Sequence, residues 1–214
     1  MDLATRRAPD GWVPVEHRVV GLDRRSFLPG LVTLAVALVL IYGLPALNAA
    51  IPWDNEVRAG DVLDLGAGAT AVPPPGWQLE DGTLTGGAAA SPTSLRVVLV
   101  RGGSTIVLTG AAFTGGAAAF LDQVQRSEDD DTPGVDGPRG TVITASGLVG
   151  VVQGRGGPGG DGLDAAFKVA AGTPAEIDAA PALLVRVKAP PGQFEQVRDE
   201  VAALLRSITP GAGR

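Results

Sequence analysis

The chain has no cysteine and only one histidine, His17, among its 214 residues. Without thiols, the protein can form neither disulfides nor thiolate metal sites. With its single histidine near the N-terminus, the remainder of the chain can build neither a Ser/His/Asp triad nor a histidine-based metal site. These absences exclude the common nucleophilic hydrolases and zinc enzymes, and we expect a protein without catalytic residues, bound metal or other cofactor.

Lysine is nearly absent as well: Lys168 and Lys188 are the only two, and arginine supplies the other basic side chains. Both lysines fall in predicted strands, where a lysine usually points outward from an exposed sheet face. We therefore expect neither to serve a Ser/Lys catalytic pair. The net charge of −6 also disfavours nucleic acid as a partner, because a phosphate backbone requires a basic surface.

Charged residues are missing altogether from one long segment. The 28 residues from Ser26 to Trp53 carry no charged side chain, and Leu31 to Ala50 form their apolar centre. About 20 apolar residues in a helix span the hydrocarbon layer of a bilayer, whereas the apolar part of a cleaved signal peptide is about 7 to 15 residues long. No small-residue cleavage tripeptide follows this run. The sequence therefore predicts one retained transmembrane helix over residues 26–53.

The charges that flank this segment predict its orientation. Arg24 and Arg25 lie directly before the apolar run, whereas Trp53 and Asp54 follow it. Because basic residues stay on the cytoplasmic side, residues 1–25 form a short cytoplasmic arm and the rest of the chain is extracytoplasmic. Trp53 would anchor the outer boundary. Residues 24–28 also resemble the twin-arginine export motif, and that alternative places the domain on the same side.

After the membrane segment, residues 54–70 are typical of a stalk and residues 71–210 of one α+β domain. Two helices are predicted by apolar residues at helical spacing, over residues 117–126 and 194–208. Strands are predicted near Trp77, over residues 95–101 and 105–110 as a hairpin, over 141–145 running on to 148–153, and over 163–170 and 182–189. Hairpin-like connections favour an antiparallel sheet packed with helices.

This order of elements resembles a known fold. A tryptophan strand after prolines (Pro75, Gly76, Trp77), a hairpin leading to a short helix, three strands and a terminal helix ending in LLRSI (residues 204–208) are similar to the Mog/PsbP-like fold. The layout of arm, single span and such a domain is also similar to the mycobacterial trehalose monomycolate transport factors, and the arginine-, alanine- and glycine-rich composition resembles that of actinobacterial proteins. The resemblance implies a protein that binds or assists rather than catalyses.

Two patterns that suggest a ligand do not fulfil their requirements. The acidic run from Glu128 to Asp136 lacks the ligand spacing and closing glutamate of an EF-hand, and is interpreted as a solvated loop whose role stays open. Gly154 to Gly159 satisfy G-x-G-x-x-G, but a strand rather than a helix follows them. A dinucleotide site requires a helix there, so we interpret these glycines as a flexible connection.

The sequence thus predicts a membrane-anchored binding or scaffold module of the cell envelope. Its partner would be a lipid, a glycolipid or a membrane protein such as an envelope lipid transporter. If an apolar ligand enters the domain, Trp77, Phe113 and Phe120 are candidates for its lining, although core packing is the common role of such residues.

Two other classes of function are alternatives. The first is an envelope enzyme that uses carboxylates only, with Asp161 and Asp164 or the run Asp129 to Asp131 as candidates. The second is a single-pass signalling protein whose arm docks to a cytoplasmic partner. Neither the partner nor the oligomeric state follows from the sequence.

Overall fold

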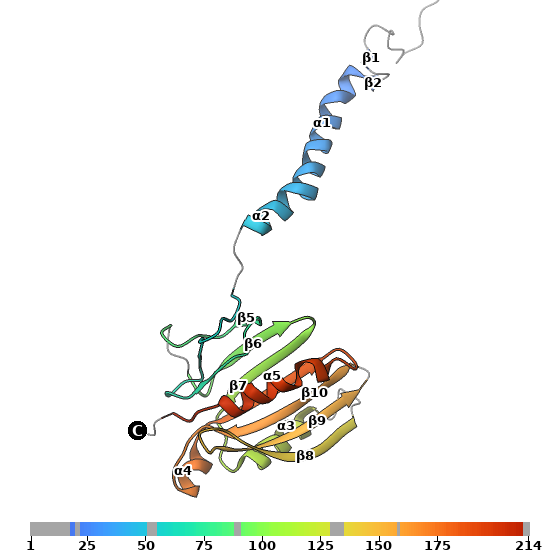
Figure 1. Cartoon of the computed structure of the whole chain (residues 1–214). Coiled ribbons are helices and arrows are strands. Elements are labelled where there is room, and N and C mark those ends of the chain that lie inside the picture. The colour runs from blue at the N-terminus through green and yellow to red at the C-terminus, as the bar shows by residue number, and fades with distance from the viewer. Residues whose placement is uncertain are drawn as a thin grey trace, which may run out of the picture. The chain divides into compact units, whose positions relative to one another are not determined.

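The structure, a computed structural model, describes residues 18–19, 22–50, 55–87, 91–128, 135–157 and 159–211. The chain divides into two compact units, Met1–Trp53 and Asp54–Arg214 (Figure 1). The first unit contains an antiparallel pair of two-residue strands, β1 Arg18–Val19 and β2 Leu22–Asp23, and the long N-terminal helix.

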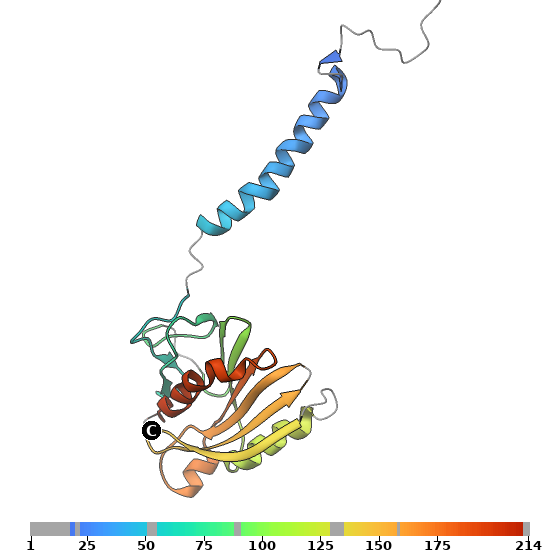
Figure 2. The same ribbon diagram turned by 45° about the vertical axis from the view of Figure 1, so that its right-hand side comes forward.

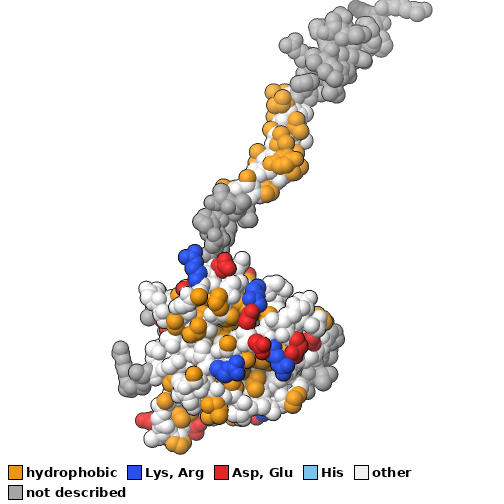
Figure 3. Space-filling model, viewed as in Figure 1, with side chains coloured by type: hydrophobic (Ala, Val, Ile, Leu, Met, Phe, Trp, Pro, Cys, Tyr) orange, Lys and Arg blue, Asp and Glu red, His pale blue; other side chains and the backbone are white. Residues whose placement is uncertain are grey.

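The predicted N-terminal apolar helix is present as one run of helical structure. It consists of α1 Arg24–Leu38, a π-helical turn η2 Val39–Gly43 and α2 Leu44–Ala50. Residues Leu28–Leu47 have a mean hydropathy of 2.3, and none of that window is buried. Figure 3 shows hydrophobic side chains along this helix, which is long and apolar enough to cross a membrane. Trp53 and the side chains of Arg24 and Arg25 lie outside the described residues.

The π-helical turn has a local cause in the sequence. Pro45 has no N–H to donate to the carbonyl four residues earlier, and its ring clashes with that carbonyl in a regular α-helix. The backbone N–H of Leu44 donates instead to the carbonyl of Val39, five residues earlier. The wider turn accommodates the proline without breaking the helix.

The second unit is built on one antiparallel sheet of seven strands in the order β5-β6-β7-β11-β10-β9-β8. The strands are β5 Gln78–Asp81, β6 Arg96–Arg101, β7 Ser104–Ala111, β8 Val135–Ile143, β9 Val149–Gly157, β10 Gly160–Lys168 and β11 Ala182–Ala189. A separate two-stranded pair, β3 Leu63–Asp64 and β4 Thr70–Ala71, lies before it in the chain.

Helices cover both faces of the sheet (Figures 1 and 2). Helix α5, Phe194–Ser207, packs with residues 55–84 on one face, where the main core contains Trp77, Phe167 and Leu204. Helix α3, Ala117–Glu128, covers β9, β10 and β11 on the other face, around Leu121. Because strand side chains alternate between faces, the central strands are apolar on both.

The expected α+β class with an antiparallel sheet and packed helices is confirmed. The predicted hairpin over residues 95–110 corresponds to β6 and β7, and the two predicted helices correspond to α3 and α5. Strand β11 has the predicted bounds, 182–189.

Three details differ from the sequence-based expectation. The segment expected as a stalk, residues 54–70, belongs to the domain, because Val57, Leu63 and Leu65 are buried in the main core. The run 141–153 is two strands, β8 and β9, joined by a turn at Gly147 with a φ of 84°. A short helix α4, Pro174–Ala179, was not predicted, although Thr173 and Glu176 form a capping box at its start.

Lys168 also differs, because it is buried with a relative exposure of 3%. It ends β10 on the face that α3 covers. Its ammonium donates hydrogen bonds to the carbonyl oxygens of Phe113 at 2.6 Å and Asp178 at 3.0 Å, and lies 5.6 Å from the Phe113 ring centroid. Desolvation by burial lowers the pKa of Lys168, and the nearby Asp178 carboxylate partly opposes this. The lysine thus ties three chain segments together.

We expect Lys168→Met to destabilise the domain by about 2 kcal/mol, because two charge-assisted hydrogen bonds to backbone carbonyls are lost. Lys188→Met is the matched control, since Lys188 is exposed, and it should change the free energy of unfolding by less than about 0.5 kcal/mol. Urea unfolding followed by circular dichroism measures both. Equal effects at the two lysines would contradict the role given to Lys168.

Candidate functional site

A concave region lies between α5 and strands β8, β9 and β10, and we call it the α5 groove. It consists of two adjoining hollows that share Gly154, Gly162 and Phe194. The glycine end, of about 430 Å³, is lined also by Gly137, Arg155, Gly156, Asp161, Gly192 and Glu195. The apolar end, of about 300 Å³, is lined also by Val142, Val152, Leu163, Arg198, Ala202, Leu205 and Arg206. Hollows of this size suit small organic ligands.

The glycine end exists because β9 carries no side chain at Gly154 and Gly156, where α5 passes. In the β9–β10 register, Gly154 pairs with Leu163 and Gly156 with Asp161. A Cβ at Gly154 would have no neighbour nearer than 3.9 Å, so the space above this residue is open. Gly162 has a different role, because a Cβ there would collide with the carbonyl oxygen of Val187. Of the glycines interpreted as a flexible connection, Gly154 and Gly156 therefore line the floor of a groove.

The apolar end follows from the alternation of the same strands. Val152 of β9 and Leu163 of β10 point to the α5 face, where both are only partly buried against the main core. Phe194 and Leu205 of α5 line the side opposite the strands. The result is an open, mainly apolar hollow that continues into the glycine end.

Charged side chains surround the groove in both signs. Asp161 accepts a hydrogen bond from the backbone N–H of Gly192, which fixes the loop that leads into α5. Glu195 pairs with Arg198 at 2.9 Å on the exposed side of α5. Figure 3, with α5 in front, shows acidic and basic side chains interspersed on this face. The groove thus offers an apolar interior and a polar rim.

A second polar cluster lies on the same face, at Glu200 of α5. Its carboxylate accepts a hydrogen bond from the Trp77 indole Nε1 at 2.7 Å and pairs with Arg101 at 2.7 Å. The Arg101 guanidinium lies 5.2 Å from the Trp77 ring centroid. Burial opposes ionisation of Glu200, but the hydrogen bonds from Trp77 and Arg101 and the arginine charge outweigh it, so the pKa of Glu200 lies below its usual range.

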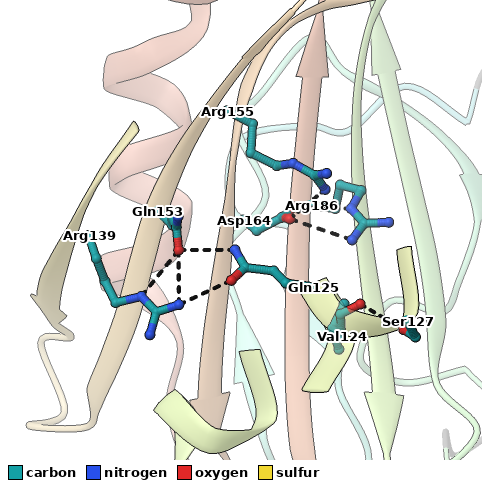
Figure 4. A network of polar contacts seen from close by, with 8 residues as sticks. All are labelled: Val124, Gln125, Ser127, Arg139, Gln153, Arg155, Asp164 and Arg186. Atoms are coloured by element: carbon teal, nitrogen blue, oxygen red, sulfur yellow. Dashed lines mark hydrogen bonds and ion pairs between the residues drawn. The ribbon is translucent and has the colours of Figure 1, made fainter. Parts of the chain in front are cut away.

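The opposite face of the sheet carries two arginine clusters, drawn in Figure 4. Asp164 of β10 is fully buried and accepts from Arg155 Nη1 at 2.9 Å and from Arg186 Nε at 3.0 Å. Both oxygens of the Asp164 carboxylate are thus paired with guanidinium groups, and its side chain has no exposed surface.

Arg139 forms the other cluster. Its guanidinium donates to the side-chain oxygens of Gln125 and Gln153 at 3.1 and 3.0 Å (Figure 4). It also pairs with Asp122 of α3 at 2.7 Å. These contacts fix α3 to strands β8 and β9. Within the described ranges, no buried side-chain nitrogen or oxygen lacks a hydrogen-bond partner, and no group of three His, Asp or Glu residues is placed to hold a metal.

The structure separates the three aromatic residues proposed from the sequence as ligand contacts. Trp77 is fully buried in the main core beneath Glu200. Phe113 and Phe120 lie on the opposite face, beside each other with ring centroids 5.2 Å apart. None of them lines the α5 groove. The sequence signals for the groove were the glycine run at 154–162 and the first turn of the terminal helix.

The carboxylates of the enzyme alternative are not brought together either. Asp161 lies at the α5 groove, whereas Asp164 faces the other side of the sheet in its arginine cluster. Asp129 to Asp131 lie outside the described residues.

Comparison with solved structures gives a fold similarity. No protein-family model matches the chain, and no curated protein matches it. The solution structure of cyanobacterial PsbP (CyanoP) from Synechocystis sp. PCC 6803 is similar, with a TM-score of 0.43 and 12% sequence identity over 67% of this chain and 87% of that chain. That protein is a PsbP, and the order of elements in this sequence resembles the Mog/PsbP-like fold. At this identity, the similarity transfers no ligand, partner or activity.

We expect Glu200→Gln to lower the free energy of unfolding by about 1 kcal/mol at pH 7, because Trp77 and Arg101 then contact a neutral side chain instead of a carboxylate. The effect is no larger because the Glu200–Arg101 pair is partly open to solvent. A carboxylate whose pKa is lowered in the folded state stabilises fully above its unfolded pKa and loses that effect as the pH falls through the folded value. The difference should therefore vanish in acid.

Urea unfolding from neutral pH into the acid range tests this, with Glu80→Gln on the exposed part of β5 as the control. A difference that is independent of pH would show that the charge of Glu200 does not contribute.

Proposed function

We propose that the chain is a membrane-anchored, non-catalytic binding module of the cell envelope whose α5 groove receives an amphiphile such as a lipid or glycolipid. The observation that carries the proposal is the groove itself, an apolar hollow that continues into a glycine-floored one. An acyl chain fits the apolar end, and a polar head group fits the glycine end, where backbone and charged side chains are accessible.

The N-terminal helix supports this proposal through location. A domain tethered to a membrane meets its ligands at high effective concentration, and lipids are the most abundant amphiphiles there. Arg24 and Arg25 favour an orientation in which the arm is cytoplasmic and the domain is extracytoplasmic. A lipid-binding domain in this position could also serve a membrane-protein partner such as an envelope lipid transporter.

Lipid binding can be tested with the full chain in nanodiscs that contain a phospholipid with a photoreactive group on its acyl chain. We expect adducts on peptides from α5 and β9–β10 in addition to those on the N-terminal helix. Gly154→Leu should reduce the groove adducts about tenfold, because the new side chain fills the open space. Gly116→Leu is the control, since a Cβ there meets nothing within 4 Å and the residue lies beside α3, away from the groove.

Adducts restricted to the N-terminal helix would contradict lipid binding and leave the anchor supported. Groove adducts that persist unchanged in Gly154→Leu would show that the lipid binds elsewhere on the domain.

The proposed orientation has its own test, which exploits the absence of native cysteine. In intact cells, a membrane-impermeant maleimide should label the full chain carrying Glu195→Cys, because this side chain is exposed on α5. Asp2→Cys should be labelled only after permeabilisation. The reverse pattern would contradict the orientation, and a product shortened by about 50 residues would contradict the anchor in favour of a cleaved signal.

A further inference from the structure

The two edges of the seven-stranded sheet differ in how they are protected. At the β5 edge, residues 55–57 run alongside the strand: the Leu79 N–H donates to Asn55 O at 2.8 Å and the Val57 N–H to Trp77 O at 2.7 Å. Strand β5 is also short and has a bulge between Leu79 and Asp81. Covering, shortening and bulging are the usual means by which proteins prevent further strand pairing.

The β8 edge has this protection only in its first half. A register shift between Asp136 and Arg139, together with Pro138, disrupts the strand there. From Arg139 to Ile143 the pairing with β9 is regular, and no described segment pairs with the outer side of these residues. This half of the edge strand lies at the margin of the sheet in Figure 1.

The direction of the free backbone groups follows from one hydrogen bond. The Thr144 N–H donates to Leu148 O at 2.9 Å, so Thr144 faces β9. Backbone direction alternates along a strand, so Val142 and Gly140 also face β9, whereas Arg139, Thr141 and Ile143 direct their N–H and C=O groups away from it. The edge thus offers an incoming strand three N–H and C=O pairs, which are spaced symmetrically about Thr141.

The side chains along this edge favour pairing. Ile143 is 63% exposed and lies beside Val149 of β9, which is 60% exposed. They are two of the three large hydrophobic side chains exposed in the described part of the domain, the third being Val72. Arg139, the only charged residue of the segment, is directed toward α3 and is neutralised by Asp122. The edge therefore carries no uncompensated charge that would repel a neighbouring strand.

We propose that β8 pairs antiparallel with β8 of a second copy of this chain, about a two-fold axis at Thr141. In this register Arg139 lies opposite Ile143 of the other copy, and Thr141 lies opposite itself. Every outward donor and acceptor of the three residues then meets its counterpart, which is the self-complementarity that a two-fold interface requires. The exposed Ile143 is covered by the Arg139 stem of the other copy. Tethering in one membrane raises the local concentration of the two copies.

The test uses the full chain, which has no native cysteine, in lipid vesicles at a low protein-to-lipid ratio. A short bismaleimide should link Thr141→Cys into a dimer, because directly opposite Cβ atoms lie about 5 Å apart. Glu80→Cys, at the opposite edge of the sheet, is the control for random collision. We expect dimer yields about tenfold above this control, corresponding to a preference of about 1.4 kcal/mol.

A second substitution tests the edge itself. Adding Ile143→Lys to Thr141→Cys should return cross-linking to the control level, because it places a charge at the seam. Adding Val72→Lys, which charges another exposed hydrophobic residue, should leave cross-linking unchanged. A Thr141→Cys yield equal to that of Glu80→Cys would overturn the proposal. Cross-linking in native membranes to a different protein, without the dimer, would overturn it as well.

Discussion

The packing of α5 against the centre of the sheet is the contact on which the rest of the domain depends. Its buried stripe, Val197, Val201, Leu204 and Leu205, covers one face of strands that are already closed by α3 on the other. The same helix accepts the Trp77 hydrogen bond through Glu200 and lines the groove with Phe194. Core, polar network and candidate site therefore share one element, and the groove is the part of the α5 contact where glycine leaves the sheet surface unfilled.

Much of this fold follows from local patterns in the sequence. The α5 stripe is visible because apolar residues recur at helical spacing after two prolines, and β11 is visible because Pro181 and Pro190 bound a run rich in leucine and valine. The N-terminal helix follows from the absence of charge. In each case the decisive information lies within about 20 consecutive residues, so neighbouring sequence alone is sufficient.

The incorrect or missing expectations depend on contacts between distant residues. Lys168 looks like an outward lysine until α3 and α4 cover its face and provide the carbonyls of Phe113 and Asp178. Residues 54–70 look like a stalk until Val57 and Leu63 meet the core. The groove is harder still to predict, because it is defined by missing Cβ atoms on β9 beneath a helix that begins about 40 residues later. The sequence shows the glycines but not what lies above them.

The proposed groove and the proposed β8 pairing are geometrically linked. Residues directly opposite each other in an antiparallel pair point to the same face, so two copies joined at β8 would present both α5 helices on one side of a continuous sheet. Val142 lines the apolar end and lies one residue from the two-fold axis at Thr141. The two apolar ends would thus approach each other across the seam, with only the paired β8 strands between them. Dimerisation at this edge would place two amphiphile sites side by side on a common surface.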